Sequence, residues 1–227
     1  MIVITGVSGG LGSYLVEHLG REYEIIGTYN KHKPNIIGPR VLFCQMDVCE
    51  SGSVEHFVST VADKLQHIVL INMAGISLDG MGHKMEEATW DRVMDTNLKG
   101  TFLMCRALLP FMRKQEWGRI INVSSIVGQM GVPGTIAYSA SKSGLFGLTR
   151  TLASENVMKN ITVNVLALGY FEVGMIKVIS PEIQEQIRAS IPMKRFGHPR
   201  NLELAIRFLI ECDYITGATI NINGGLL

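Results

Sequence analysis

The sequence predicts a doubly wound α/β domain, with about seven parallel strands and helices on both faces of the sheet. Short runs of apolar, often β-branched residues recur along the 227-residue chain, as in parallel strands buried on both faces. Amphipathic stretches of helical length separate these runs. Internal repeats and linkers rich in Gly, Ser or Pro are absent, so residues 1–227 are expected to form one domain.

The apolar runs predict strands over residues 1–4, 24–28, 41–46, 67–72, 120–124, 162–168 and 219–222. The amphipathic stretches predict helices over residues 11–21, 53–65, 87–98, 100–115, 138–156 and 199–210. Residues 169–197 are the least regular part, with Pro181, Pro192 and little strand character. Long irregular connections in compact domains are usually functional, so this stretch is expected to form a lid on the substrate side.

The composition excludes several classes of protein. With 47% apolar and 18% charged residues, the chain is long enough to bury a core and is not disordered. Its 21 Lys and Arg balance 20 Asp and Glu without a basic cluster, which argues against nucleic acid as a partner. A strand from the first residue and short apolar runs predict neither signal peptide nor membrane span. The four cysteines lack metal-ligand spacing, so a reduced, cytoplasmic protein without a metal site is expected.

A glycine-rich segment, Thr5 to Gly12, lies directly between the first predicted strand and the first predicted helix. In this context Gly6 allows a sharp turn, Gly10 leaves room for a pyrophosphate, and Gly12 lets the helix pack closely on the sheet. An ordinary tight turn is the alternative interpretation. The cofactor contacts expected here are Gly6, Ser8, Gly9, Gly10, Leu11 and Gly12.

Tyr138 and Lys142 are four residues apart and share one face of a predicted helix. A nearby cation favours the phenolate and lowers the tyrosine pKa, so Tyr138 is a candidate general acid for a carbonyl oxygen or base for an alcohol. Ser124 and Ser125 end a buried strand, at the sheet edge where open α/β sheets bind ligands. A serine here can hold a substrate oxygen as charge develops, or it can cap the backbone.

The spacing Gly-x-x-x-Gly-x-Gly after Thr5, followed by Tyr138-x-x-x-Lys142, resembles the short-chain dehydrogenase/reductase family over nearly the whole chain. Residues 142–155, 195–199 and 214–225 resemble its 3-oxoacyl carrier-protein reductase branch. The resemblance implies a Rossmann-type fold and reversible reduction of a ketone to an alcohol by hydride transfer from NAD(P)H. A small carbonyl or alcohol substrate is therefore expected.

The same resemblance assigns catalytic roles to four residues, Asn97, Ser125, Tyr138 and Lys142. The family's serine lies at the interval of Ser125 from the tyrosine, so Ser125 is preferred and Ser124 is expected to cap backbone. Lys142 is expected to lower the Tyr138 pKa and to hold the nicotinamide ribose. Asn97 is expected to steady a helix kink and a water that relays protons to the lysine.

Cofactor choice is expected to depend on residues 28–33, Thr-Tyr-Asn-Lys-His-Lys, after the second strand. These residues include no acid that could accept a hydrogen bond from the ribose 2′-hydroxyl of NAD. Asn30 and Lys31 can instead donate hydrogen bonds to the 2′-phosphate of NADP. NADP(H) is therefore favoured and NAD(H) is the alternative. The family pattern adds the expected cofactor contacts Asp47, Val48, Asn72, Ala74, Gly75, Tyr138, Lys142, Gly169 and Val173.

Three residues depart from the family pattern. Met73 replaces an asparagine and is expected to loosen a strand end. Leu168 replaces a proline, and Val173 stands where a threonine often donates to the cofactor. Two departures on one loop are expected to weaken cofactor binding without abolishing it.

The substrate pocket is expected to be mostly apolar, favouring a ketone with an apolar flank, and to contain Ile126, Met130, Thr135, Tyr170 and Met175. An acyl carrier protein is a further expected partner, and Arg113, Lys114 and Lys159 are its candidate contacts. By resemblance, a homotetramer or dimer is expected through helices 100–115 and 138–156. The alternatives are a non-catalytic dinucleotide-binding sensor or scaffold, and a sugar-nucleotide epimerase, which length and glycine spacing disfavour.

Overall fold

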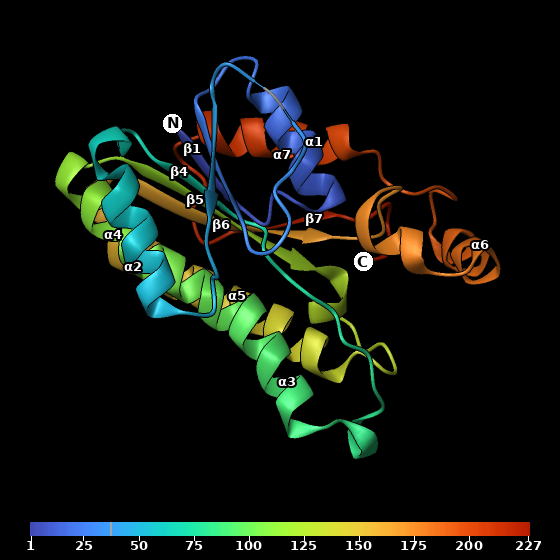
Figure 1. The fold of residues 1–227 in the computed structure, drawn as a ribbon. Coiled ribbons are helices and arrows are strands. Elements are labelled where there is room, and N and C mark those ends of the chain that lie inside the picture. Colours follow the sequence, from blue (N-terminus) through green and yellow to red (C-terminus); the bar gives the residue numbers. More distant parts are fainter. Residues whose placement is uncertain (37) are drawn as a thin grey trace.

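A computed structural model describes residues 1–36 and 38–227, and their strands form one parallel sheet in the order β3-β2-β1-β4-β5-β6-β7 (Figure 1). The strands are β1 (Ile2–Thr5), β2 (Ile25–Tyr29), β3 (Val41–Gln45), β4 (Val69–Asn72), β5 (Gly118–Ser125), β6 (Ile161–Leu168) and β7 (Thr219–Ile222). Every neighbouring pair of strands is parallel. The predicted doubly wound, Rossmann-type sheet is confirmed.

The α-helices are α1 (Gly10–Leu19), α2 (Ser51–Val61), α3 (Glu87–Met94), α4 (Gly100–Gln115), α5 (Ile136–Asn156), α6 (Pro181–Ser190) and α7 (Pro199–Glu211). Shorter turns are η1 (Ala62–Lys64), η2 (Gly82–Lys84), η3 (Asp95–Lys99), η4 (Ile126–Gly128), η5 (Val157–Lys159) and η6 (Gly174–Val178). The helix predicted over residues 87–98 ends at Met94, because η3 is a π-helical turn. The helix α6 was not predicted. Pro181 starts it, since a proline at the first helical position gives up only an N–H that would be unpaired there.

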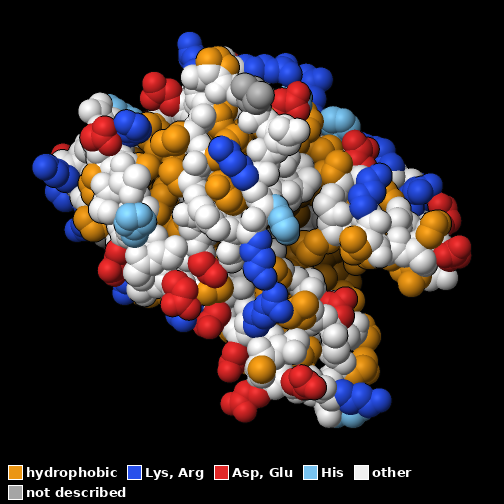
Figure 2. Space-filling view, viewed as in Figure 1, with side chains coloured by type: hydrophobic (Ala, Val, Ile, Leu, Met, Phe, Trp, Pro, Cys, Tyr) orange, Lys and Arg blue, Asp and Glu red, His pale blue; other side chains and the backbone are white. Residues whose placement is uncertain are grey.

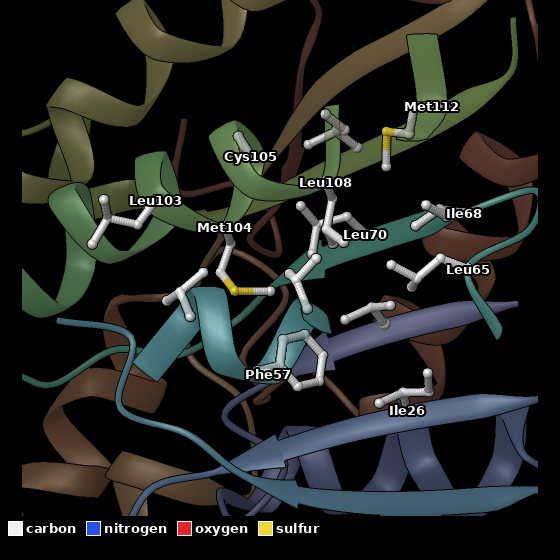
Figure 3. Packing of buried hydrophobic residues seen from close by; sticks show 14 of the residues in the cluster. Ile26, Phe57, Leu65, Ile68, Leu70, Leu103, Met104, Cys105, Leu108 and Met112 are labelled. Atoms are coloured by element: carbon white, nitrogen blue, oxygen red, sulfur yellow. The ribbon is translucent and has the colours of Figure 1, made fainter. Parts of the chain in front are cut away.

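Both faces of the sheet are buried, as the continuous apolar strands predict. Val3 packs on the side of α2, α4 and α5, whereas Ile2 and Ile4 pack on the side of α1 and α7 (Figure 1). Figure 3 shows Phe57 of α2 and Leu108 of α4 packed together on the first of these faces. Each such large apolar side chain contributes about 1.5–3 kcal/mol when it is fully buried.

The carboxyl ends of the parallel strands share one edge, and the chain changes direction within the sheet between β1 and β4. From β1 it runs outward to β2 and β3, and it then returns to β4 on the other side of β1. Open α/β sheets bind ligands at such a switch point, outside the carboxyl ends of the strands. In Figure 1, α6 lies at the right, beyond the end of β6. Among the described residues, no helix has the length and apolar character that crossing a membrane requires.

Candidate active site

The turn between β1 and α1 requires the predicted glycines at two positions. Gly6 has φ of +75°, and a Cβ added to it would lie 2.7 Å from the Cα of Ala74. A Cβ on Gly12 would lie 2.6 Å from the carbonyl oxygen of Gly6. Gly9, the N-cap residue of α1, has no side chain that could cap the helix, and the first turn of α1 holds no acid. The N–H groups and positive dipole end of this helix therefore suit an anion such as a pyrophosphate.

The segment that follows β6 lies directly against the phosphate loop. A Cβ on Gly10 would lie 2.7 Å from the backbone nitrogen of Gly174 and 3.2 Å from Cβ of Val173. Gly10 and Val173, both predicted to contact the cofactor, are thus neighbours. A Cβ on Gly169 would instead lie 2.7 Å from Cα of Asn223. Close packing against the chain after β7 therefore accounts for that glycine, and its contact with a cofactor stays a prediction.

Two departures from the family pattern fit the sheet without breaking it. The hydroxyl oxygen of Thr5 accepts hydrogen bonds from the backbone N–H groups of Met73 and Ala74, both at 3.0 Å. The strand end that Met73 was expected to loosen is therefore held by Thr5. Leu168 is 6% exposed and is the last residue of β6, in register with Ser125. A leucine at this position lets the strand continue to the edge of the site.

The loop after β2 is tied to the phosphate loop and to β3. The Asn30 side-chain amide donates to Oδ2 of Asp47 at 3.0 Å, and Gln45 Nε2 donates to the backbone oxygen of Asn30 at 2.9 Å. The Ser8 hydroxyl donates to the backbone oxygen of His32. Asn30 and Ser8 therefore hold this loop in place, while the side chain of Lys31, between these anchors, is exposed.

Three of the four predicted catalytic residues meet at the carboxyl edge of the sheet. Nζ of Lys142 lies 5.7 Å from the ring centroid of Tyr138 on α5, and it donates to the backbone oxygen of Val123 at 2.8 Å. Ser125 ends β5, and its hydroxyl lies 3.4 Å from the backbone oxygen of Leu168. The Ser124 hydroxyl donates to the backbone oxygen of Lys142 at 2.8 Å, which is the backbone role expected for it.

Asn97, the fourth predicted catalytic residue, is fully buried in the π-helical turn. Its Oδ1 accepts from the N–H of Ile76 at 2.8 Å, and its Nδ2 donates to the oxygen of Ile76 and to Oγ of Ser141, both at 2.9 Å. Ser141 precedes Lys142 on α5, so Asn97 connects the loop after β4 to the catalytic helix. The sequence reasoning missed Ser141, which no motif distinguishes from other helix serines.

Burial determines the ionisation of the tyrosine–lysine pair. Burial raises the pKa of Tyr138 to about 12. The negative charge of Asp79 and the phenol of Tyr170 raise this pKa further, whereas a hydrogen bond with Ser125 lowers it. Burial also lowers the pKa of Lys142 to about 8. The expectation that Lys142 lowers the Tyr138 pKa is thus not met, because desolvation of the phenol is the largest effect.

Asp79 is a charged group of the site that the sequence reasoning missed. It lies on the exposed loop after β4, and its Oδ1 accepts a hydrogen bond from the Ser77 hydroxyl at 2.8 Å. Its negative charge raises the pKa of Tyr138 because two nearby negative charges repel each other. No local pattern marks this residue; only the fold brings the loop to the phenol.

Replacing Asp79 with asparagine is expected to lower the pKa of Tyr138 while an oxygen remains to accept from Ser77. Alcohol oxidation needs the phenolate, so its rate at pH 8 should rise about two- to tenfold, since one pKa unit changes the phenolate fraction tenfold below the pKa. The measurement is the initial rate of secondary-alcohol oxidation at several pH values. Asp63→Asn, which removes an acid paired with Lys64, is the control. An unchanged rate for Asp79→Asn would contradict this role.

The residues predicted to line the substrate pocket differ in burial. Ile126 is 3% exposed and part of the core, whereas Met130 and Met175 are exposed. The Thr135 hydroxyl bonds at the start of α5, to the oxygen of Val132 and to Oγ of Ser139. Tyr170 is half-buried. Figure 2 shows a recess with apolar side chains between the α6 segment and the rest of the molecule.

The basic residues predicted near the cleft lie at the opposite edge of the sheet. Arg113 and Lys114 end α4 just before β5 begins, and Lys159 just precedes β6. The eight residues of β5 separate that edge from Ser125 by roughly 25 Å. Lys159 is moreover paired with Glu116 at 2.7 Å. The expectation was wrong because helices of an α/β fold run antiparallel to the strands and end at the amino edge.

The fold and this site define an oxidoreductase that uses a dinucleotide. A glycine turn and an uncapped helix face the carboxyl edge where a serine, a tyrosine and a lysine meet. Among residues 1–36 and 38–227, no group of three His, Cys, Asp or Glu side chains is placed to hold a metal ion.

Comparison with known proteins gives the family. The model of the short chain dehydrogenase family matches residues 1–184. The chain is 36% identical to 3-oxoacyl-[acyl-carrier-protein] reductase FabG of Staphylococcus epidermidis over 99% of this chain and 97% of the relative. It is 36% identical to Nodulation protein G of Azospirillum brasilense and 35% identical to the FabG reductase of Vibrio cholerae, each over 99% of this chain and 96% of the relative.

The chain therefore belongs to the short-chain dehydrogenase/reductase family. It is an NAD(P)-dependent oxidoreductase of the class that acts on CH–OH and keto groups. This membership favours the enzyme over a sensor or scaffold that only binds a dinucleotide.

Proposed function

We propose that this protein reduces a ketone with NADPH and, in reverse, oxidises the secondary alcohol. The observation that carries the proposal is the meeting of Ser125, Tyr138 and Lys142 at the carboxyl edge of the sheet, beside the glycine turn. The relatives named as 3-oxoacyl-[acyl-carrier-protein] reductases support a 3-oxoacyl thioester as one substrate to test, with an acyl carrier protein as partner.

The residues at the first turn fit a dinucleotide. A side chain at Gly6 or Gly12 would clash with the neighbouring backbone. The N-terminus of α1 has uncapped N–H groups that can bind a pyrophosphate. Asp47 and Val48 would contact the adenosine, and Lys142 the nicotinamide ribose. When bound, the dinucleotide supplies the hydride that the carbonyl carbon receives.

Residues of the protein supply the proton that the carbonyl oxygen receives. The Ser125 hydroxyl holds the carbonyl oxygen, and Tyr138 donates its phenolic proton to that oxygen, which becomes the hydroxyl of the alcohol. A pKa of about 12 keeps Tyr138 protonated at neutral pH, which suits reduction. Lys142, with a pKa of about 8, carries a proton that can be returned to the phenolate. Asn97 holds the loop after β4 against the helix that carries both groups.

The segment 169–197 would act as the lid of a one-domain enzyme. It contains η6 and α6, extends beyond β6 in Figure 1, and places Val173 and Gly174 against Gly10 of the phosphate loop. Exposed apolar side chains on this segment, Met175 and Val178, suit a substrate with an apolar flank. Phe102 on α4 and Val157 and Met158 after α5 are also exposed and support a dimer or tetramer through these helices.

The choice of NADP(H) rests on Lys31, which is exposed on a loop fixed by Asn30 and Ser8 and has no acid beside it in residues 28–33. Lys31→Ala is expected to lower kcat/KM for NADPH about tenfold and to leave that for NADH nearly unchanged, because a hydrogen bond to a charged group contributes about 1.5–3 kcal/mol. Lys114→Ala, at the other edge of the sheet, is the control. Equal losses with both cofactors would contradict the assignment.

The reaction is tested by measuring the oxidation of NADPH, from the decrease in its absorbance, in the presence of a panel of ketones and short 3-oxoacyl thioesters. We expect turnover on at least one 3-oxoacyl thioester, with formation of the secondary alcohol. Tight binding of NADPH without turnover on any member of the panel would favour the binding-only alternative.

A further inference from the structure

Lys142 is attached to β5 by both its side chain and its backbone. Its Nζ donates to the backbone oxygen of Val123 at 2.8 Å, and its own backbone oxygen accepts from the hydroxyl of Ser124 at 2.8 Å. The side chains of Lys142 and Ser124 are both buried, so water does not compete for these hydrogen bonds. Two consecutive residues of β5 therefore hold a single residue of α5.

The turn η4, directly after β5, contacts the same stretch of α5 from a second direction. A Cβ added to Gly128 would lie 2.9 Å from the backbone carbonyl carbon of Lys142 and 3.0 Å from the backbone nitrogen of Ser143. The Ser143 hydroxyl donates to the backbone oxygen of Gly128 at 2.7 Å. The backbone of α5 at Lys142 is thus packed against this turn, and it cannot move toward η4 without a clash.

The position of α5 along β5 determines where Tyr138 lies relative to Ser125. Because α5 connects the parallel strands β5 and β6, it runs antiparallel to β5. Tyr138 precedes Lys142 by one helical turn, about 6 Å along the axis, and Ser125 follows Ser124 by about 3.3 Å. Both steps lead toward the carboxyl edge of the sheet. The bond between Ser124 and Lys142 therefore sets the distance between Tyr138 and Ser125, whose side chains hydrogen-bond.

We propose that Ser124 is a positioning residue, whose hydroxyl fixes α5 on β5 so that Tyr138 and Ser125 meet the same substrate oxygen. The inference rests on the proposed ketone reduction, in which that oxygen receives the proton of Tyr138. Ser124 acts through the backbone of Lys142 and touches no reacting atom. Lys142 lies inside α5, so its backbone oxygen also accepts from the N–H four residues further on. Loss of the Ser124 hydroxyl therefore leaves no buried backbone acceptor unpaired, and the fold should survive it.

A second buried hydrogen bond joins the same two elements farther from the reacting groups. Nδ2 of Asn122 on β5 donates to Oγ1 of Thr149 on α5 at 2.9 Å, and both residues are buried. Thr149 follows Lys142 by seven residues, which is about 10 Å along the helix. Thr149→Val removes this hydroxyl and keeps the shape of the side chain. It is the matched control for Ser124→Ala, because it weakens the same contact between α5 and β5 away from Lys142.

The kinetic test compares Ser124→Ala, Thr149→Val and the unmodified protein in reduction of the best ketone by NADPH. Ser124→Ala should lower kcat about 10- to 100-fold, because a small misplacement of reacting groups costs that much. Its KM for NADPH should stay within about twofold, since no binding group is lost. Thr149→Val should lose thermal stability, because it leaves a buried donor unpaired, and yet keep its kcat. An unchanged kcat in Ser124→Ala, or equal losses in both variants, overturns the positioning role.

Crystal structures of the unmodified protein and the two variants separate this inference from the proposed reaction. We expect the distance between Oη of Tyr138 and Oγ of Ser125 to lengthen by about 1 Å in Ser124→Ala, and to stay the same in Thr149→Val. That result in a protein that reduces no ketone would reject the proposed reaction and keep the role of Ser124. An unchanged distance in Ser124→Ala, in a protein that does reduce ketones, would reject the role of Ser124 and keep the reaction.

Discussion

Replacing Tyr138 with phenylalanine is expected to lower kcat for ketone reduction about a thousandfold, within the 10²–10⁴ range of a positioned general acid. The phenol hydrogen-bonds with Ser125, and Lys142 lies over its ring. Phenylalanine keeps the ring, and therefore the packing on α5, but removes the proton that the carbonyl oxygen must receive. KM should change little, because the loss concerns the transition state.

The measurement is NADPH oxidation with the best ketone of the panel, for the unmodified protein and for Tyr138→Phe. Tyr214→Phe is the control, since the side chain of Tyr214 is 96% exposed and lies far along the chain from the site. Thermal unfolding of both variants should match that of the unmodified protein. Equal rates for Tyr138→Phe and the unmodified protein would remove Tyr138 from the reaction.

Replacing Lys142 with methionine is expected to abolish most of the activity and yet to stabilise the fold at neutral pH. Lys142 is 4% exposed, and burial lowers its pKa from 10.5 to about 8. At pH 7 the folded protein therefore holds a buried charge whose desolvation costs about 3 kcal/mol, at about 1.4 kcal/mol per pKa unit. Loss of the hydrogen bond to the oxygen of Val123 offsets about 1 kcal/mol of the gain.

The sign of the pH dependence follows from the lowered pKa. Between about pH 8 and 10.5 the unfolded chain binds a proton at Lys142 that the folded chain has released. The contribution of this group to the free energy of unfolding therefore rises with pH across that window and is lowest below it. Lys142→Met should remove this rise, so the two proteins should differ most at pH 7 and least above pH 10.5.

Urea unfolding at pH 7 and pH 10, followed by tryptophan fluorescence, measures this difference. Lys114→Met, a substitution at an exposed lysine, is the control and should be neutral at both pH values. The activity of Lys142→Met should fall about a thousandfold, because the residue beside the general acid is lost. A variant less stable than the unmodified protein at pH 7 would show that the charge of Lys142 stabilises the fold, against this account.

Local patterns in the sequence were enough to predict much of the architecture. The apolar runs predicted the seven strands, and the position of the first glycine segment predicted the turn at which Gly6 has a positive φ. The spacing of Tyr138 and Lys142 predicted that they share a helix face. These features depend on neighbours in sequence, and backbone geometry translates them directly into structure.

Other features depended on contacts between distant segments. The helix α6 was missed because its first residue, Pro181, looks like a helix breaker without its context. The π-helical turn at Asn97 has no local signal, since Ile76 and Ser141, which bind its side chain, come from other elements. The sequence alone suggests that the basic residues Arg113 and Lys114 lie near the cleft, whereas in the structure they lie at the end of α4, at the far edge of the sheet.

The sequence by itself determined the family pattern, the parallel sheet, the phosphate turn and the residues expected to perform the chemistry. Only the tertiary structure decided their electrostatics, because pKa values depend on burial and on charges that come from other segments. Thus burial, and not the neighbouring cation, sets the pKa of Tyr138, and Asp79 acts on it from a loop far away in sequence.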